Sequence, residues 1–138
     1  MISMKHLKVC GAILIFDNKV LAAKRGEGKY EYVSFKYEFP GGKIEEGETP
    51  EEALHRELIE EMKLDIDIDS MKFFYTVNHI YPDFEITMHT FICPMKSPEV
   101  TLTEHVNVCW NRIEDLEKLD WAPADRPVVR ELMSKGIV

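Results

Sequence analysis

The segment 41–64, GGKIEEGETPEEALHRELIEEMKL, constrains the fold of this chain more than any other stretch. It opens with two adjacent glycines, which favour a tight loop with close backbone approach. Thr49, Pro50 and Glu52 then match a capping box, in which Thr49 caps the helix, Pro50 takes the first helical position and Glu52 the third. The pattern therefore predicts a glycine loop followed by a helix over about residues 50–62.

One face of this predicted helix is acidic and borders an apolar stripe. Eight of the seventeen residues from Glu45 to Glu61 are glutamates. At about 100° per residue, the helix gathers apolar residues on one stripe and acidic residues on the arc beside it. The stripe holds Leu54, Leu58 and Met62, and the arc holds Glu57, Glu60 and Glu61.

Such an arc has two interpretations. Solvated acidic faces are common, and Arg56 could neutralise part of this one. However, like charges four residues apart destabilise a helix by a few tenths of a kcal/mol, and these carboxylates lie beside the buried stripe. Clustered carboxylates on a rigid element suit a hard divalent cation such as Mg²⁺, which prefers oxygen ligands. We favour a metal site over a solvated face.

The rest of the chain predicts a mixed α/β domain. Alternating apolar segments indicate strands separated by turn residues, and a polar loop is expected over 26–36. A last helix should start at Asp125 and stop at Gly136. This order of elements predicts a mainly antiparallel or mixed sheet with helices on its faces. The expected strands are 5–16, 19–25, 37–39, 66–81, 84–95 and about 105–110.

Composition excludes several classes of protein. A length of 138 residues suits one domain, 1–138, with one core. The net charge of −8 argues against a partner that is a nucleic acid polymer. The apolar run 9–16 is too short to span a membrane, and we expect a cytoplasmic protein with no membrane partner. The three cysteines are odd in number and widely separated, which favours reduced thiols.

The spacing in segment 42–64 resembles the Nudix box. Gly42 is followed by five residues, Glu48, seven residues and then Arg56-Glu57-Leu58-Ile59-Glu60-Glu61. The longer run 38–53, EFPGGKIEEGETPEEA, is similar to the MutT-like and CTP pyrophosphohydrolase branch of that family, which sanitises nucleotide pools. One residue departs from the pattern. Lys63 stands at the family's glycine near the helix end, where either a left-handed conformation would cost about 1 kcal/mol or the helix end would shift.

The resemblance implies a fold, a cofactor and a reaction. The fold is the Nudix fold, a mixed β-sheet sandwiched between α-helices. The reaction is Mg²⁺-dependent attack of water on a nucleoside triphosphate, releasing nucleoside monophosphate and pyrophosphate, with Mn²⁺ as a possible substitute for Mg²⁺. The metal would be held by the Gly41 carbonyl and by Glu57, Glu60 and Glu61. Glu48 and Arg56 would pair and orient the metal-binding face.

The remaining candidate residues each have a structural alternative. By resemblance Glu104 is a further metal ligand or general base, and an exposed loop glutamate is equally expected. Arg25 could reach the phosphates or remain solvated. Asp125 could contact the base edge or cap the last helix. The substrate-binding candidates are Arg25, Glu38, Gly42, Lys43 and Asp125. Phe39 is expected in the core, and His55, His79, His89 and His105 on the surface or in the core.

The substrate itself is left among several candidates. An ionised Asp125 would favour bases that offer hydrogen-bond donors, which leaves 8-oxo-dGTP and CTP, dCTP or 5-methyl-dCTP as the candidates and makes uracil and thymine poor substrates. The resemblance of the EFPGGKIEEGETPE run to the MutT-like pattern puts 8-oxo-dGTP first. A nucleotide sugar or dinucleotide is a further candidate, since the box reads only the diphosphate. A non-catalytic nucleotide sensor should have lost a box glutamate, and a calcium-buffering helix leaves the spacing unexplained. The protein could be a monomer or a homodimer.

Overall fold

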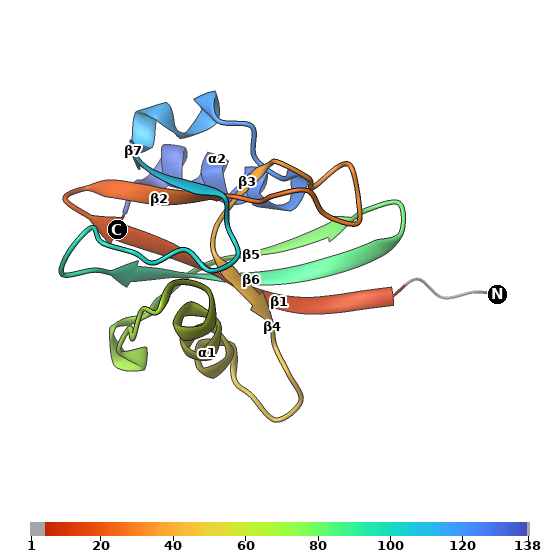
Figure 1. Ribbon diagram of the computed structural model, residues 1–138, viewed down its shortest axis with the longest axis horizontal. Helices are drawn as coiled ribbons and strands as arrows, with labels where there is room; N and C mark the ends of the chain where they lie inside the picture. Colours follow the sequence, from red (N-terminus) through yellow and green to blue (C-terminus); the bar gives the residue numbers. More distant parts are fainter. Residues whose placement is uncertain (1–4, 138) are drawn as a thin grey trace.

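The computed structural model describes residues 5–137, which fold into one seven-stranded sheet with helices on both sides (Figure 1). The strands are β1 (Lys5–Phe16), β2 (Lys19–Lys24), β3 (Tyr37–Glu38), β4 (Gly41–Lys43), β5 (Lys72–Ile80), β6 (Phe84–Pro94) and β7 (Asn107–Arg112). The helices are α1 (Pro50–Met62) and α2 (Arg126–Lys135), with 3-10 turns η1 (Ile68–Ser70), η2 (Ile113–Lys118) and η3 (Pro123–Asp125).

Strand β1 organises the sheet. The strand order is β3-β2-β1-β6-β5, with β4 also paired to β1 and β7 to β2. The β1–β6 pair is parallel and the others are antiparallel, so the sheet is mixed, as the sequence predicted. Because β1 is long, its middle, Val9 to Gly11, pairs with β4 and its end pairs with β2. This register places Gly41 opposite Gly11, and Gly42 opposite Cys10.

Each face of the sheet carries its own apolar core. The three residues of the predicted stripe on α1, Leu54, Leu58 and Met62, are fully buried against one face. On the other face, α2 buries Val128 and Leu132 with Trp121. Figure 1 shows α1 and α2 on opposite sides of the sheet. The predicted α/β sandwich is confirmed.

Both ends of α1 form as the sequence indicates. Thr49 accepts a hydrogen bond from the Glu52 amide, and the Glu52 side chain accepts one from the Thr49 amide, which completes the capping box. Lys63 adopts the left-handed conformation with φ 53°, and the next amide, of Leu64, donates to the Leu58 carbonyl. Lys63 therefore occupies a position that favours glycine.

Several boundaries differ from the prediction. The Asp67 side chain accepts a hydrogen bond from the Asp69 amide and forms turn η1, so β5 begins only at Lys72. The glycine loop is partly a strand, β4, because it pairs with β1. Strand β7 begins two residues later than expected, at Asn107. Within residues 5–137, no helix is long and apolar enough to cross a membrane.

Asp125 precedes α2 as predicted, but the capping interpretation of its side chain is wrong. Turn η3 already curls the chain before α2, and the Asp125 side chain makes no cap hydrogen bond. Its Oδ1 instead accepts a hydrogen bond from the Phe39 amide, 3.2 Å away. The carboxyl group therefore faces β3 rather than the amides of its own helix.

Candidate active site

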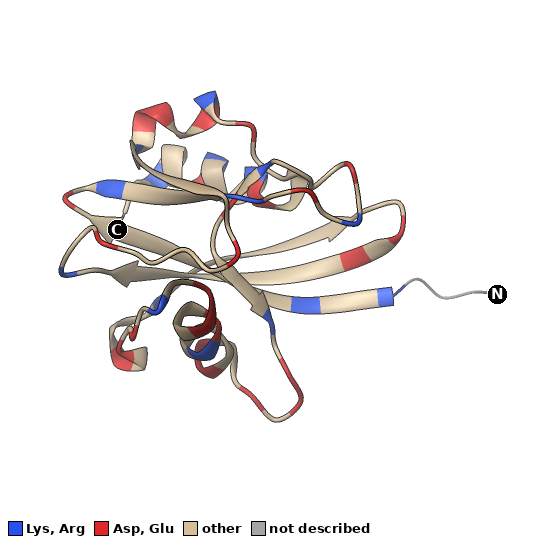
Figure 2. Ribbon diagram, in the orientation of Figure 1, with Lys and Arg blue, Asp and Glu red and all other residues tan. Residues whose placement is uncertain are grey.

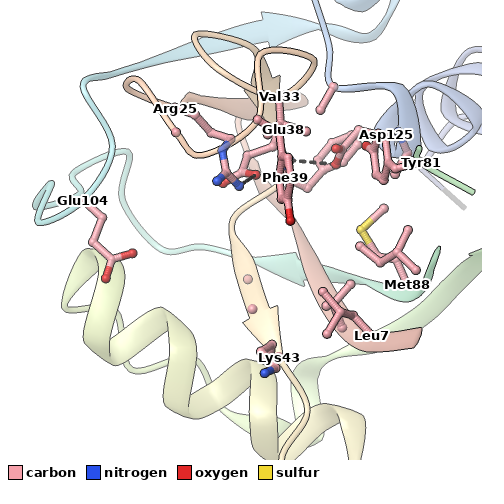
Figure 3. A pocket seen from close by; sticks show the side chains of 18 of the residues that line it. Leu7, Arg25, Val33, Glu38, Phe39, Lys43, Tyr81, Met88, Glu104 and Asp125 are labelled. Atoms are coloured by element: carbon pink, nitrogen blue, oxygen red, sulfur yellow. Dashed lines mark hydrogen bonds and ion pairs between the residues drawn. The ribbon is translucent and has the colours of Figure 1, made fainter. Parts of the chain in front are cut away.

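A cavity of about 520 Å³ opens between β1, β4, the 26–36 loop and turn η3. Figure 3 shows Glu104 on one side of it, Leu7, Met88, Tyr81 and Asp125 on the other, and Arg25 and Glu38 between them. Every substrate-binding candidate named from the sequence lines this cavity, as do Gly41, Glu61 and Glu104. Residues far apart in the chain thus converge on a single pocket.

The acidic residues concentrate along α1 and the loop before it (Figure 2). Glu61 is the buried member of this group, with 6% of its surface exposed. Its Oε2 has no hydrogen-bond partner among the described residues. Burial, followed by the negative charges of Glu38, Glu57 and Glu104, raises the pKa of Glu61 to about 9. A buried, charged carboxylate with one oxygen left without a partner is costly, so this group requires a proton or a cation.

Arg56 holds the box together. Its guanidinium donates two hydrogen bonds of 2.9 Å to the Glu48 carboxylate, one to each oxygen, and this lowers the pKa of Glu48 to about 2. A third nitrogen donates to Glu57 Oε1 at 2.9 Å, and Glu60 lies 3.5 Å away. Arg56 also donates to the Lys43 carbonyl, which ties α1 to β4. The predicted pairing of Glu48 with Arg56 is therefore present.

The two glycines are required by close packing. A Cβ on Gly42 would lie 2.3 Å from Glu57 Cδ, so the Glu57 carboxylate occupies the space that a side chain would need. A Cβ on Gly41 would lie 2.0 Å from the Cys10 carbonyl oxygen of β1. Gly42 thus lets the β4 backbone approach the acidic face of α1, and Gly41 lets it approach β1.

Glu38 lies at the centre of the pocket and connects its two ends. Its Oε1 pairs with Arg25 at 3.1 Å, and its Oε2 is 2.8 Å from His105 Nε2. Burial is the main reason that the pKa is raised for both Glu61 at the acidic end and Asp125 at the other end, and the charge of Glu38 is the second cause for each. Arg25 therefore lines the pocket in an ion pair with Glu38, while 41% of its side chain stays exposed to solvent.

Sequence reasoning missed His105 and Tyr81 as pocket residues. The His105 side chain is 4% exposed, and its Nδ1 has no partner among residues 5–137. The Tyr81 hydroxyl accepts a hydrogen bond from the Ala124 amide and fixes turn η3 against β5. No local pattern marks either residue, because their partners are 67 and 43 positions away in the chain. Phe39 is in the core, as expected, stacked on Trp121 at 4.7 Å.

Comparison with known proteins identifies the family. The family model described as NUDIX domain matches residues 5–132. The chain belongs to the NUDIX domain family. It is a Nudix hydrolase, and the resemblance seen in the box is confirmed.

Three relatives illustrate the match of this Nudix chain. An Escherichia coli protein named 8-oxo-dGTP diphosphatase is 33% identical over 130 residues, which cover 94% of this chain and 98% of that one. An Escherichia coli protein named CTP pyrophosphohydrolase is 29% identical, covering 95% of this chain and 94% of that one. The solution structure of MutT from methicillin-resistant Staphylococcus aureus is 38% identical with a TM-score of 0.69, covering 97% of this chain and all of that one.

Nudix hydrolases generally use a divalent metal, and the acidic end of the pocket fits one. The orphaned Oε2 of Glu61 and the Glu57 carboxylate seated against Gly42 are oxygen donors suited to a hard cation. In the described part of the chain, no three His, Cys, Asp or Glu side chains are already arranged to hold an ion. Glu57 and Glu60 are turned towards Arg56 instead, so they would have to exchange this partner for the cation.

Proposed function

We propose that this Nudix protein is a Mg²⁺-dependent nucleoside triphosphate pyrophosphohydrolase that releases nucleoside monophosphate and pyrophosphate. The observation that supports this most directly is the buried Glu61 carboxylate, whose Oε2 has no partner among the described residues, at the acidic end of a pocket sized for a nucleotide. The anionic substrate and this acidic end repel each other unless a cation lies between them. The preferred substrate we propose is 8-oxo-dGTP.

The acidic end would bind the cation and the phosphates. Glu57, Glu60, Glu61 and the Gly41 carbonyl would hold Mg²⁺, for which Mn²⁺ could substitute. The bound metal would offset phosphate charge and lower the pKa of a coordinated water. Glu104 would act beside them as a further ligand or as the general base, since its charge already acts on Glu57 and Glu61. Arg25 and Lys43 would contact the phosphates.

The other end would bind the base. Asp125 is buried, and its burial raises the pKa well above the ordinary range, with the charge of Glu38 as the second cause. One oxygen accepts from the Phe39 amide, so the other can carry the proton in the free protein. A neutral carboxyl group donates as well as accepts. The expected preference for bases with several hydrogen-bond donors required an ionised Asp125. Because burial favours the protonated form of Asp125, that expectation is weakened.

The choice of 8-oxo-dGTP therefore rests on the relatives. The 8-oxo-dGTP diphosphatase of Escherichia coli is the more similar of the two curated relatives described above. The second candidate is CTP, dCTP or 5-methyl-dCTP, supported by the similarity to the CTP pyrophosphohydrolase. We further propose that the protein acts in the cytoplasm on free nucleotides, as a monomer or homodimer.

A substrate panel tests the proposal. The protein is incubated with canonical, oxidised and methylated nucleoside triphosphates, nucleotide sugars and dinucleotides, with Mg²⁺ or with EDTA, and kcat/KM is measured for each. We expect metal-dependent turnover, highest with 8-oxo-dGTP, and equal amounts of monophosphate and pyrophosphate by chromatography. Release of orthophosphate alone would contradict the assigned bond. Binding without turnover would favour the non-catalytic sensor.

A further inference from the structure

The 26–36 loop between β2 and β3 is tied at its base and projects a tip. At the base, the Arg25 amide donates to the Lys36 carbonyl at 2.9 Å, and the Phe35 amide donates to the Gly26 carbonyl at 3.2 Å. These bonds fix where the loop leaves the sheet. Within the loop, the Ser34 hydroxyl accepts a hydrogen bond from the Gly28 amide at 2.8 Å and donates one to the Tyr30 carbonyl at 2.8 Å, which shapes the tip but does not attach it to the sheet.

The tip is held by a clamp on the turn between β5 and β6, which Figure 1 shows beside it. Tyr32 stacks on Tyr81 with ring centroids 5.0 Å apart and planes 15° apart. Tyr30 also stacks on Tyr32, with ring centroids 5.2 Å apart and planes 11° apart, and its ring lies 5.4 Å from that of Phe84. The Tyr32 hydroxyl donates to Asp83 Oδ2 at 2.8 Å. These contacts join residues about fifty positions apart.

The clamp determines one wall of the pocket. From the loop, Tyr30 and Val33 line the cavity, and Phe84 and Ile86 of β6 line it from the sheet. Leu7 of β1 adds a further apolar side chain to the lining, and Figure 3 shows it on the side of the cavity away from Glu104. If the tip left the β5–β6 turn, this apolar lining would open to water and lose its outer wall. Apolar and aromatic walls are what a planar base requires for stacking.

We propose that Tyr32 and Asp83 are positioning residues of the base subsite, because they clamp the 26–36 loop so that Tyr30 and Val33 wall in the base. This inference rests on the proposed function, since it assumes a nucleotide in the pocket. Neither residue contacts the substrate in this arrangement. Their effect passes through the loop, so it falls on recognition of the base and leaves the phosphate end unaffected.

Two variants each remove the hydrogen bond of the clamp, and a third variant serves as a matched control. Tyr32→Phe keeps the stacked ring and deletes only the hydroxyl, while Asp83→Ala deletes its acceptor. Both positions are on the surface or partly exposed, so the fold should survive. Tyr75→Phe on β5 is the control, because Tyr75 lies outside the pocket lining and its hydroxyl makes no hydrogen bond within residues 5–137.

The first measurement is amide hydrogen exchange of peptides covering 29–34 in the metal-free and nucleotide-free protein. Loss of one charge-assisted hydrogen bond at the surface should accelerate exchange roughly three- to tenfold in both clamp variants. The double variant should exchange no faster than the single ones, because either change already breaks the bond. Peptides from α1 and the Tyr75→Phe control should be unchanged. Unchanged exchange at 29–34 would overturn the clamp.

The second measurement separates the base from the phosphates. The KM of the best nucleoside triphosphate should rise about three- to tenfold in Tyr32→Phe and Asp83→Ala, with kcat changed less than about twofold. The inhibition constant of inorganic tripolyphosphate with Mg²⁺, a probe without a base, should remain at the wild-type value. An equal rise for tripolyphosphate, or faster exchange with an unchanged KM, would overturn the assignment to the base subsite.

The proposed function can fail separately. If the wild-type protein neither binds nor hydrolyses any nucleoside triphosphate, the base subsite is overturned together with that function. The exchange experiment then still decides whether Tyr32 and Asp83 clamp the loop. If wild-type turnover follows the proposed reaction and both variants behave as wild type, only the clamp is wrong.

Discussion

The substitution Glu61→Gln should stabilise the metal-free protein while removing most of its activity. The pKa of Glu61 is about 9 in the folded protein, against an ordinary value of 4.5. The folded state thus holds a proton that the unfolded state releases above pH 4.5. A pH of 7 lies about 2.5 units above the unfolded pKa, and each unit lowers the free energy of unfolding by about 1.36 kcal/mol. The total loss of stability at pH 7 is therefore about 3 kcal/mol. Glutamine keeps the shape of the protonated acid and escapes this cost.

The pH dependence provides the decisive assay. Because the pKa of Glu61 is higher in the folded state than in the unfolded state, the contribution of Glu61 to the free energy of unfolding is fully present below pH 4.5. This contribution declines as the pH rises towards 9. Urea denaturation in EDTA at pH 5 to 9 should therefore show wild type losing stability across this range while Glu61→Gln declines less. Added Mg²⁺ should restore wild type more than the variant, because the metal replaces the proton.

The control and the refuting result are equally specific. Glu46→Gln removes a charge from the exposed loop before α1, where the change should stay within about 0.5 kcal/mol at every pH. If Glu61→Gln is less stable than wild type in EDTA at pH 7, the Glu61 carboxylate makes favourable contacts that the structure does not contain, and the metal argument fails. Full activity in Glu61→Gln would exclude Glu61 as a metal ligand.

Three further substitutions test other parts of the site. Gly42→Ala should lower kcat at least tenfold, because its Cβ would displace the Glu57 carboxylate, and the Tm without metal shows whether the fold survives. Lys63→Gly should raise the free energy of unfolding by about 1 kcal/mol in urea and leave kcat unchanged, since glycine removes the left-handed strain. Asp125→Ala should lower kcat/KM for the favoured base by an amount equivalent to about 1 to 3 kcal/mol, and it should change kcat/KM for poor substrates little. A uniform loss across all bases would show that the hydrogen bond to the Phe39 amide only supports the fold.

The acidic helix is the part of this protein that the sequence determined. Its start at Thr49 and its left-handed end at Lys63 depend on hydrogen bonds within a few residues, so local chemistry is sufficient to predict them. The resemblance to the Nudix box likewise implied the pairing of Glu48 with Arg56, which the structure contains. The roles of the box residues in binding metal stay predictions, as does the extent of the single domain.

The pocket beyond the helix was decided by tertiary structure. Asp125 illustrates the reason, because before a helix its type predicts a cap, yet turn η3 redirects it to the Phe39 amide 86 positions away. His105 lies in the pocket because the loop before β7 passes over Glu38. Tyr32 contacts Asp83 because the parallel β1–β6 pair places the β5–β6 turn beside the 26–36 loop. Local hydrogen bonds follow from neighbouring residues, whereas burial, charge coupling and the pocket wall depend on which distant segments the sheet brings together.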